Sequence, residues 1–144
     1  CEHGWFGQKT GRGFYLYPQG ARIGTPDPKV LTIIEAERAL KGITPRSFSY
    51  EEIMERYMAA MVNEACEVLR EAVALKPSDI DVTFVQGYGF PRFRGGPMKY
   101  ADGYGLGKML DNIRAYETED PVFWKPSPLL VDLVAAGHTF EDLN

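Results

Sequence analysis

The feature that most constrains this chain is a long amphipathic pattern that begins at Ser49. Ser49 followed three residues later by Glu52 is a capping-box signal for the start of a helix. Apolar residues then recur at helical spacing on one face, which is made of Met54, Tyr57, Met61, Ala65, Val68 and Ala72 and widened by Tyr50, Met58 and Leu69. Pro77 lies just beyond the pattern. We therefore predict a central helix from Tyr50 to about Leu75, with one face that must be buried.

Other segments carry helix signals at their ends. Asp27 and Ser127 can each cap a helix that has proline at its first position, where the missing N–H costs nothing, and Gly42 and Gly137 supply the stops. Ser78 with Asp81 three residues later predicts a further cap. The predicted helices are residues 28–41, 79–88, 105–116 and 128–136, with a short helical turn at 98–102.

Glycines and prolines separate these helices. Gly87, Gly89 and Pro91 are expected to end the helix that starts near residue 79. The phrase Gly95-Gly96-Pro97 predicts a loop whose backbone passes close to another element.

The tally is about five helices with almost no strand, which predicts an all-α bundle. Residues 1–25 are irregular, rich in glycine and aromatic side chains, with one short extended piece at 14–17. We interpret residues 1–25 as the tail of a preceding domain with a linker, and residues 26–144 as a helical domain. The chain begins at Cys1 rather than at Met, and we expect an interior piece of a longer protein.

Charge and hydropathy narrow the classes of partner. The net charge is −4, which gives no electrostatic reason to expect nucleic acid. No apolar run approaches the ~18 residues of a spanning helix, so we expect no membrane span and a cytoplasmic location, or a peroxisomal or mitochondrial one in a eukaryote. Cys1 and Cys66 make a poor disulfide pair, and Cys66 is expected to be a small buried hydrophobe.

Catalytic, cofactor-binding and metal motifs are not evident. Gly87-Tyr88-Gly89 and Gly103-Tyr104-Gly105 lack the third glycine and the preceding strand of a dinucleotide site. His3 and His138 lie at opposite ends of the chain without spaced ligand partners. We therefore predict no catalytic, cofactor-binding or metal-binding residue in this chain.

One polar pair interrupts the central helix. On a helical projection Glu64 falls at the edge of the apolar stripe, while Asn63 points away from the core beside Arg56. A half-buried carboxylate needs hydrogen-bond donors. We expect Glu64 to tie the helix to a neighbouring segment, with an active-site carboxylate as the alternative, and we treat Glu64, Arg56 and Asn63 as structural polar residues.

Taken in order, these phrases resemble the C-terminal domain of 3-hydroxyacyl-CoA dehydrogenases. The residues that carry the resemblance are Arg56 to Ala65, Ser78 to Asp81, Gly87 to Pro91, Gly95 to Pro97, and Ala101-Asp102. The opening Gly7 to Tyr15 is similar to the phrase that ends the first such domain in multifunctional β-oxidation proteins, where a second, degenerate copy follows.

The resemblance implies a parent that oxidises 3-hydroxyacyl-CoA with NAD bound by a preceding Rossmann domain, with or without an enoyl-CoA hydratase half. In the family a catalytic Asn precedes an Arg ahead of the Asn-Glu-Ala phrase, and this chain has Glu55 before Arg56. The resemblance thus implies a non-catalytic copy, inactive alone, that binds no cofactor and packs on the Rossmann and first helical domains.

Further partners implied are a second copy of the chain or a thiolase subunit. The alternative function is an independent helical module for protein interaction or acyl-CoA binding.

Overall fold

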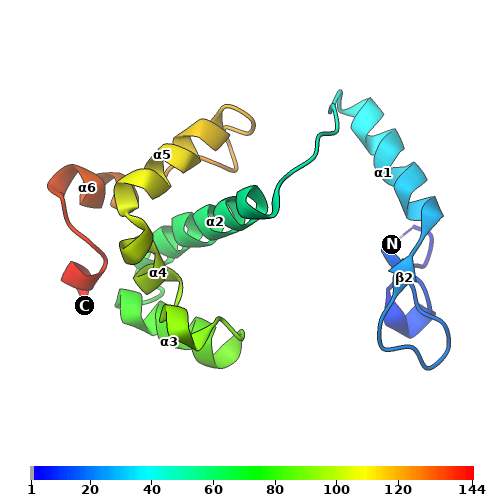
Figure 1. Cartoon of the computed structure of the whole chain (residues 1–144), viewed down its shortest axis with the longest axis horizontal. Helices are drawn as coiled ribbons and strands as arrows, with labels where there is room; N and C mark the ends of the chain where they lie inside the picture. The colour runs from blue at the N-terminus through cyan, green and yellow to red at the C-terminus, as the bar shows by residue number, and fades with distance from the viewer. Residues whose placement is uncertain (1) are drawn as a thin grey trace. The chain divides into compact units, whose positions relative to one another are not determined.

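The computed structural model describes residues 2–144, so the expectation for Cys1 lies outside the described residues. The chain forms two compact units, one that ends at Ser47 and one from Phe48 to Asn144. They are coloured blue to cyan and green to red in Figure 1.

The N-terminal unit contains one short β-ladder and one helix. Strand β1 (Tyr15–Leu16) pairs antiparallel with β2 (Thr25–Pro26), and a 3-10 turn η1 (Gln8–Thr10) precedes them. Helix α1 (Pro28–Leu40) follows, and the Asp27 carboxylate accepts a hydrogen bond from the Lys29 backbone N–H at 3.0 Å. The predicted cap, helix and extended piece are confirmed, whereas β2 begins within a segment expected to be irregular.

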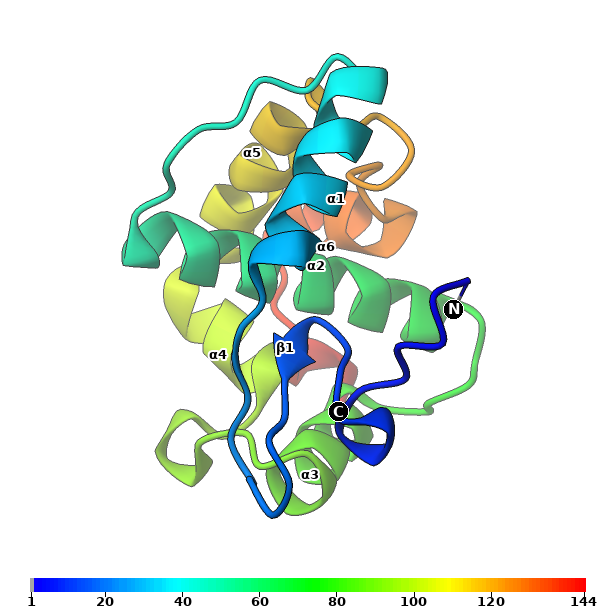
Figure 2. The same cartoon turned by 90° about the vertical axis from the view of Figure 1, so that its right-hand side faces the viewer.

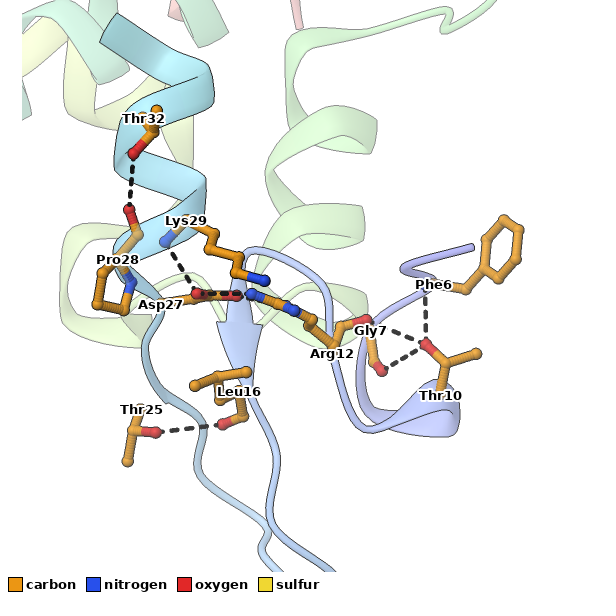
Figure 3. A network of polar contacts seen from close by, with 10 residues as sticks. All are labelled: Phe6, Gly7, Thr10, Arg12, Leu16, Thr25, Asp27, Pro28, Lys29 and Thr32. Atoms are coloured by element: carbon orange, nitrogen blue, oxygen red, sulfur yellow. Dashed lines mark hydrogen bonds and ion pairs between the residues drawn. The ribbon is translucent and has the colours of Figure 1, made fainter. Parts of the chain in front are cut away.

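A partly buried ion pair joins two segments of this unit (Figure 3). The Arg12 guanidinium donates two hydrogen bonds to the Asp27 carboxylate, at 2.6 and 3.0 Å, and lies 3.9 Å from the centre of the Trp5 ring. Asp27 therefore caps α1 and also binds the loop before β1. Because this pair links residues on both sides of the expected boundary after residue 25, α1 belongs with the N-terminal segment and the observed division falls after Ser47.

We predict that acid loosens the N-terminal unit through Asp27. The hydrogen bond from Arg12 is the largest cause that lowers the pKa of Asp27. A lowered folded-state pKa gives stability that is present above the unfolded value, about 3.9, and is lost as pH falls below it. Fluorine NMR of 5-fluorotryptophan protein can follow this, because Trp5 reports on one unit and Trp124 on the other. The Trp5 transition should be weakened in Asp27→Asn, and an identical acid transition in that variant would contradict the prediction.

The second unit is a packed set of five helices. Its elements are α2 (Tyr50–Arg70), α3 (Pro77–Gly87), η2 (Arg92–Arg94), α4 (Pro97–Tyr104), α5 (Leu106–Glu117), α6 (Pro128–Ala136) and η3 (Glu141–Leu143). Helix α2 packs against α4, α5 and α6, and α3 packs against α4. Figures 1 and 2 both show α5 on one side of α2 and α3 on the other. The side chains of Val62, Met98, Met109, Ile113, Leu130 and Phe140 are buried in the shared core.

The all-α prediction is confirmed, with three differences in detail. Helix α2 ends at Arg70 rather than near Leu75, because Ala72 adopts a left-handed backbone with φ 56°. Helix α3 begins at Pro77, and the Asp79 carboxylate, not Asp81, accepts the cap bond from the Lys76 N–H at 3.1 Å. Residues 97–104 form a complete helix, so residues 2–144 contain six α-helices rather than five.

Candidate functional site

The loop before α4 brings α3 and α4 into close contact. Gly96 has φ +123°, and a Cβ at this position would overlap the Asp81 side chain. The Asp81 carboxylate accepts hydrogen bonds from the backbone N–H of Met98 at 2.7 Å and of Lys99 at 3.1 Å. Asp81 on α3 thus caps α4, because Gly96 has no side chain to do so. The predicted close approach at Gly95-Gly96-Pro97 is confirmed, and the predicted cap by Ser78 and Asp81 is wrong.

A second aspartate fastens the C-terminal turn in the same way. The Asp102 carboxylate accepts hydrogen bonds from the N–H groups of Phe140 at 2.8 Å and Glu141 at 3.0 Å. Phe140 is only 1% exposed and lies in the core cluster. The glycines expected to end α3 also do so, since Gly87 is its last residue and Gly89 has φ +72°, with Pro91 just before η2.

Asn63, rather than Glu64, ties the central helix to its neighbours. The Asn63 amide donates to the Lys125 carbonyl at 2.9 Å and accepts from the Ser127 N–H at 2.8 Å. Glu64 is exposed, and it makes no hydrogen bond or ion pair within residues 2–144. The expectation of a half-buried Glu64 is therefore wrong. The connector between α5 and α6 covers Asn63, on the side of α2 that the apolar pattern assigns to solvent, and leaves Glu64 exposed.

Arg56 holds the other end of the same connector. Its Nε donates to Glu52 at 3.0 Å, and its two terminal nitrogens donate to Glu119 at 3.0 and 2.6 Å. The guanidinium also lies 4.0 Å from the centre of the Tyr116 ring. The hydrogen bonds with Glu119 are the largest cause that raises the pKa of Arg56. Arg56 and Asn63 thus each join α2 to this connector, and the assignment of both as structural residues stays a prediction.

We predict that Asn63→Ala lowers the free energy of unfolding by about 1–3 kcal/mol, because the Ser127 N–H and the Lys125 carbonyl both lose their partner. Glu64→Gln, one position along the same helix, is the matched control and should melt like the unchanged chain. Chemical denaturation followed by circular dichroism measures both. A larger loss for Glu64→Gln than for Asn63→Ala would contradict this assignment.

Glu55 belongs to a polar cluster that joins α2 to α4 and α5. Its carboxylate accepts a hydrogen bond from the Tyr104 hydroxyl at 2.9 Å and lies 4.0 Å from the Lys108 ammonium. The Tyr104 hydroxyl in turn accepts from the Asn112 amide at 3.0 Å. The Glu55 side chain is 40% exposed. It is held as a hydrogen-bond acceptor at the edge of a surface hollow.

Two hollows lie side by side on this unit. The α2–α3 groove has a volume of about 580 Å³ and is lined by Met61, Glu64, Ala65, Val68, Val73, Ala74, Leu75, Asp79, Ile80, Thr83, Phe84 and Tyr88. The tyrosine groove has a similar volume, about 580 Å³, and contains Glu55 together with five tyrosines, Tyr50, Tyr57, Tyr88, Tyr100 and Tyr104. The two hollows share Phe84 and Tyr88, so they form one continuous surface.

The groups that usually carry chemistry are not brought together. His3 stacks on Trp5 at 4.8 Å in the first unit, whereas His138 lies in the second. Burial raises the pKa of Cys66 to about 12, which keeps its thiol protonated. Within residues 2–144 no three His, Cys, Asp or Glu side chains are placed to hold a metal ion. The absence of catalytic residues stays a prediction.

The two Gly-x-Gly phrases that contain a tyrosine do not have the surroundings of a dinucleotide site. Gly87 to Gly89 follows the end of α3, and Gly103 to Gly105 lies between α4 and α5. The strands of residues 2–144 are two residues long and belong to the N-terminal unit. None of the described helices is long and apolar enough to cross a bilayer.

Comparisons place these elements among known proteins. The family model described as "3-hydroxyacyl-CoA dehydrogenase, C-terminal domain" matches residues 53–141. The chain is 45% identical to the peroxisomal bifunctional enzyme of Danio rerio over 95% of its own length and 20% of that protein's. It is 37% identical to a peroxisomal fatty acid beta-oxidation multifunctional protein of Arabidopsis thaliana, over 91% of the chain and 19% of the relative.

A bacterial relative is similar in the same way. The fatty acid oxidation complex subunit alpha of Shewanella amazonensis is 36% identical over 93% of the chain and 18% of that protein. The chain thus spans about a fifth of the length of these relatives.

Proposed function

Because the chain belongs to the 3-hydroxyacyl-CoA dehydrogenase C-terminal domain family, we propose that it is the second, non-catalytic helical copy of a multifunctional fatty-acid β-oxidation enzyme. The parent oxidises 3-hydroxyacyl-CoA to 3-oxoacyl-CoA with NAD. This chain completes the helical platform beside the Rossmann and first helical domains, and it serves structure and assembly. The names of the relatives support a multifunctional parent, and two of those names support a peroxisomal location.

The observation that carries the proposal is the presence of a glutamate at position 55 and the contacts that it makes. At the position where the resemblance implies a catalytic Asn, this chain has a carboxylate that accepts the Tyr104 hydroxyl and faces Lys108. An ionised carboxylate has no hydrogen to donate, whereas an amide has two. Glu55 therefore lacks the N–H donors that an Asn would offer to a substrate oxygen.

NAD does not fit the residues of this chain. A dinucleotide site needs a glycine turn between a parallel strand and the N-terminus of a helix. The Gly-x-Gly phrases of residues 2–144 lie at 11–13, 87–89, 103–105 and 105–107, and none of them stands between a strand and a helix. NAD binding thus belongs, in this proposal, to the part of the parent outside this chain.

The full-length parent tests this role. Glu55→Gln keeps the acceptor for Tyr104 and should leave kcat and KM for 3-hydroxyacyl-CoA within about twofold, measured as NADH absorbance. Loss of a group that acts in proton transfer would instead lower kcat by about 100-fold or more. A drop of that size, with an unchanged melting temperature, would overturn the non-catalytic assignment.

An independent acyl-CoA-binding module is the second candidate, favoured by the apolar α2–α3 groove of about 580 Å³. Its rim counts against it, because Glu64 and Asp79 would repel the phosphates of coenzyme A. Calorimetric titration of the chain with acetoacetyl-CoA and with a long-chain acyl-CoA decides between the two. Saturable binding would support the module, and no heat above dilution would exclude it.

A further inference from the structure

The α2–α3 groove leaves an unusual amount of apolar side chain in water. Val73 and Leu75, in the segment that leaves α2, are 75% and 82% exposed, and Tyr88 at the end of α3 is 75% exposed. These side chains surround a floor made of Ala65 and Ile80, which are buried. Apolar surface of this kind, rimmed by polar residues, marks an interaction site in soluble proteins.

The shape of the groove favours a helical partner. It lies between two helices, and the α2 residues that line it, at positions 61, 64, 65 and 68, follow one helical face. An amphipathic helix can place its own i, i+3, i+4 and i+7 side chains in such a hollow.

The charges on the groove are all of one sign. Its two charged lining residues, Glu64 and Asp79, are both acids, and both side chains are exposed. Glu64 has no ion pair within the described residues, whereas Asp79 accepts the Lys76 N–H at the start of α3. The tyrosine groove beside it adds Glu51 and Glu55 against one base, Arg94. A partner that fills this surface must therefore bring positive charge to its edges.

We propose that the α2–α3 groove binds an amphipathic helix whose apolar face is flanked by lysine or arginine. The inference rests on the proposed function in one respect, because it assigns that helix to the parent chain outside residues 1–144. About four-fifths of each relative lies outside the matched region, which leaves ample sequence to supply such a helix. Attachment to the same polypeptide would raise its effective concentration at the groove.

Other occupants fit the charges less well. A second copy of this chain that used the same groove would place Glu64 and Asp79 against equal charges, since a two-fold interface matches a patch with itself. An acyl-CoA would bring phosphates to the same acids. A basic-flanked helix is the occupant that satisfies both the apolar floor and the acidic rim.

Two synthetic peptides of about 18 residues test the proposal, each with leucines on one helical face and either Lys or Glu beside them. Fluorescence anisotropy with the whole chain should show that the Lys-flanked peptide binds at least about tenfold more tightly than the Glu-flanked one. Equal affinity for both peptides, or no binding of either, would overturn the proposal. The proposal would also be overturned if light scattering showed that the chain forms a dimer and that Leu75→Ser abolishes this dimer.

Matched variants distinguish specific binding in the groove from nonspecific electrostatic attraction to an acidic chain. Leu75→Ser should weaken binding of the Lys-flanked peptide by about tenfold, because the bound peptide would no longer bury the leucine side chain. Val122→Ser, at an equally exposed apolar position of 87% outside the groove, should leave binding within about twofold. Equal losses in the two variants would contradict a specific groove. A failed Glu55→Gln activity test would overturn the proposed function alone, whereas the peptide results decide the groove.

Discussion

Gly96→Ala is expected to lower the free energy of unfolding of the helical unit by about 3 kcal/mol. The added Cβ would occupy the space of the Asp81 side chain, and the backbone there has φ +123°, where residues with a Cβ are strained. Asp81 would have to move away from the Met98 and Lys99 N–H groups, so α4 would also lose its cap. Guanidinium denaturation followed by circular dichroism measures the loss.

Gly103→Ala is the matched control, since Gly103 lies in α4, the helix that Gly96 precedes, and a Cβ there would meet nothing within 4 Å. This substitution should be neutral or stabilise by up to about 1 kcal/mol, because alanine favours helix. In an Asp81→Ala background, Gly96→Ala should lower the free energy of unfolding by less than it does when Asp81 is present. The side chain that the new Cβ displaces is already absent there. Equal stability of the two glycine variants would contradict the close contact.

Phe140→Ala is expected to cost about 3–5 kcal/mol, the range for truncating a fully buried phenylalanine. Phe140 is 1% exposed and packs in the core although it lies beyond the last α-helix. The Asp102 carboxylate holds the backbone of this turn through the N–H groups of Phe140 and Glu141. The C-terminal turn should therefore unfold together with the helices.

Leu143→Ala serves as its control, because Leu143 is 39% exposed in the same turn. It should cost less than about 1 kcal/mol. Hydrogen exchange of the Phe140 amide gives an independent measure, since that amide should be protected to nearly the global free energy of unfolding. Rapid exchange at Phe140, or equal losses in the two variants, would show that the turn is not part of the core.

The helices could be predicted because their signals are local. Asp27 before Pro28 marks the start of α1, and the apolar spacing from Tyr50 marks α2. Where a local signal was weak, the prediction failed. The residue types around Ala72 carry no signal for a left-handed backbone, so the sequence predicts a later end for α2 than the structure has.

The polar tethers could not be predicted in the same way, because each joins residues far apart in sequence. Asn63 binds a connector more than 60 residues later, and Asp81 caps a helix 16 residues away. A helical projection places Asn63 on the solvent side, since it contains no information about which segment returns to cover that side. The sequence motifs indicate where helices and loops lie along the chain, but the contact partners of a side chain depend on the tertiary fold.

The candidate site, too, could be predicted from the sequence only in part. Glu55 could be singled out from the sequence by its place before Arg56, whereas its bond with Tyr104 and the acidic rim of the α2–α3 groove emerge from packing. The tyrosines of the second groove come from α2, α4 and the end of α3, so their convergence has no counterpart in the linear pattern.

Calorimetric titration of this chain with NAD tests the central claim most directly, because a scaffold copy has no site for the hydride acceptor. We expect no heat beyond dilution up to about 1 mM NAD, the upper end of ordinary cofactor and substrate affinities. Saturable NAD binding in the micromolar range by residues 1–144 alone would contradict it.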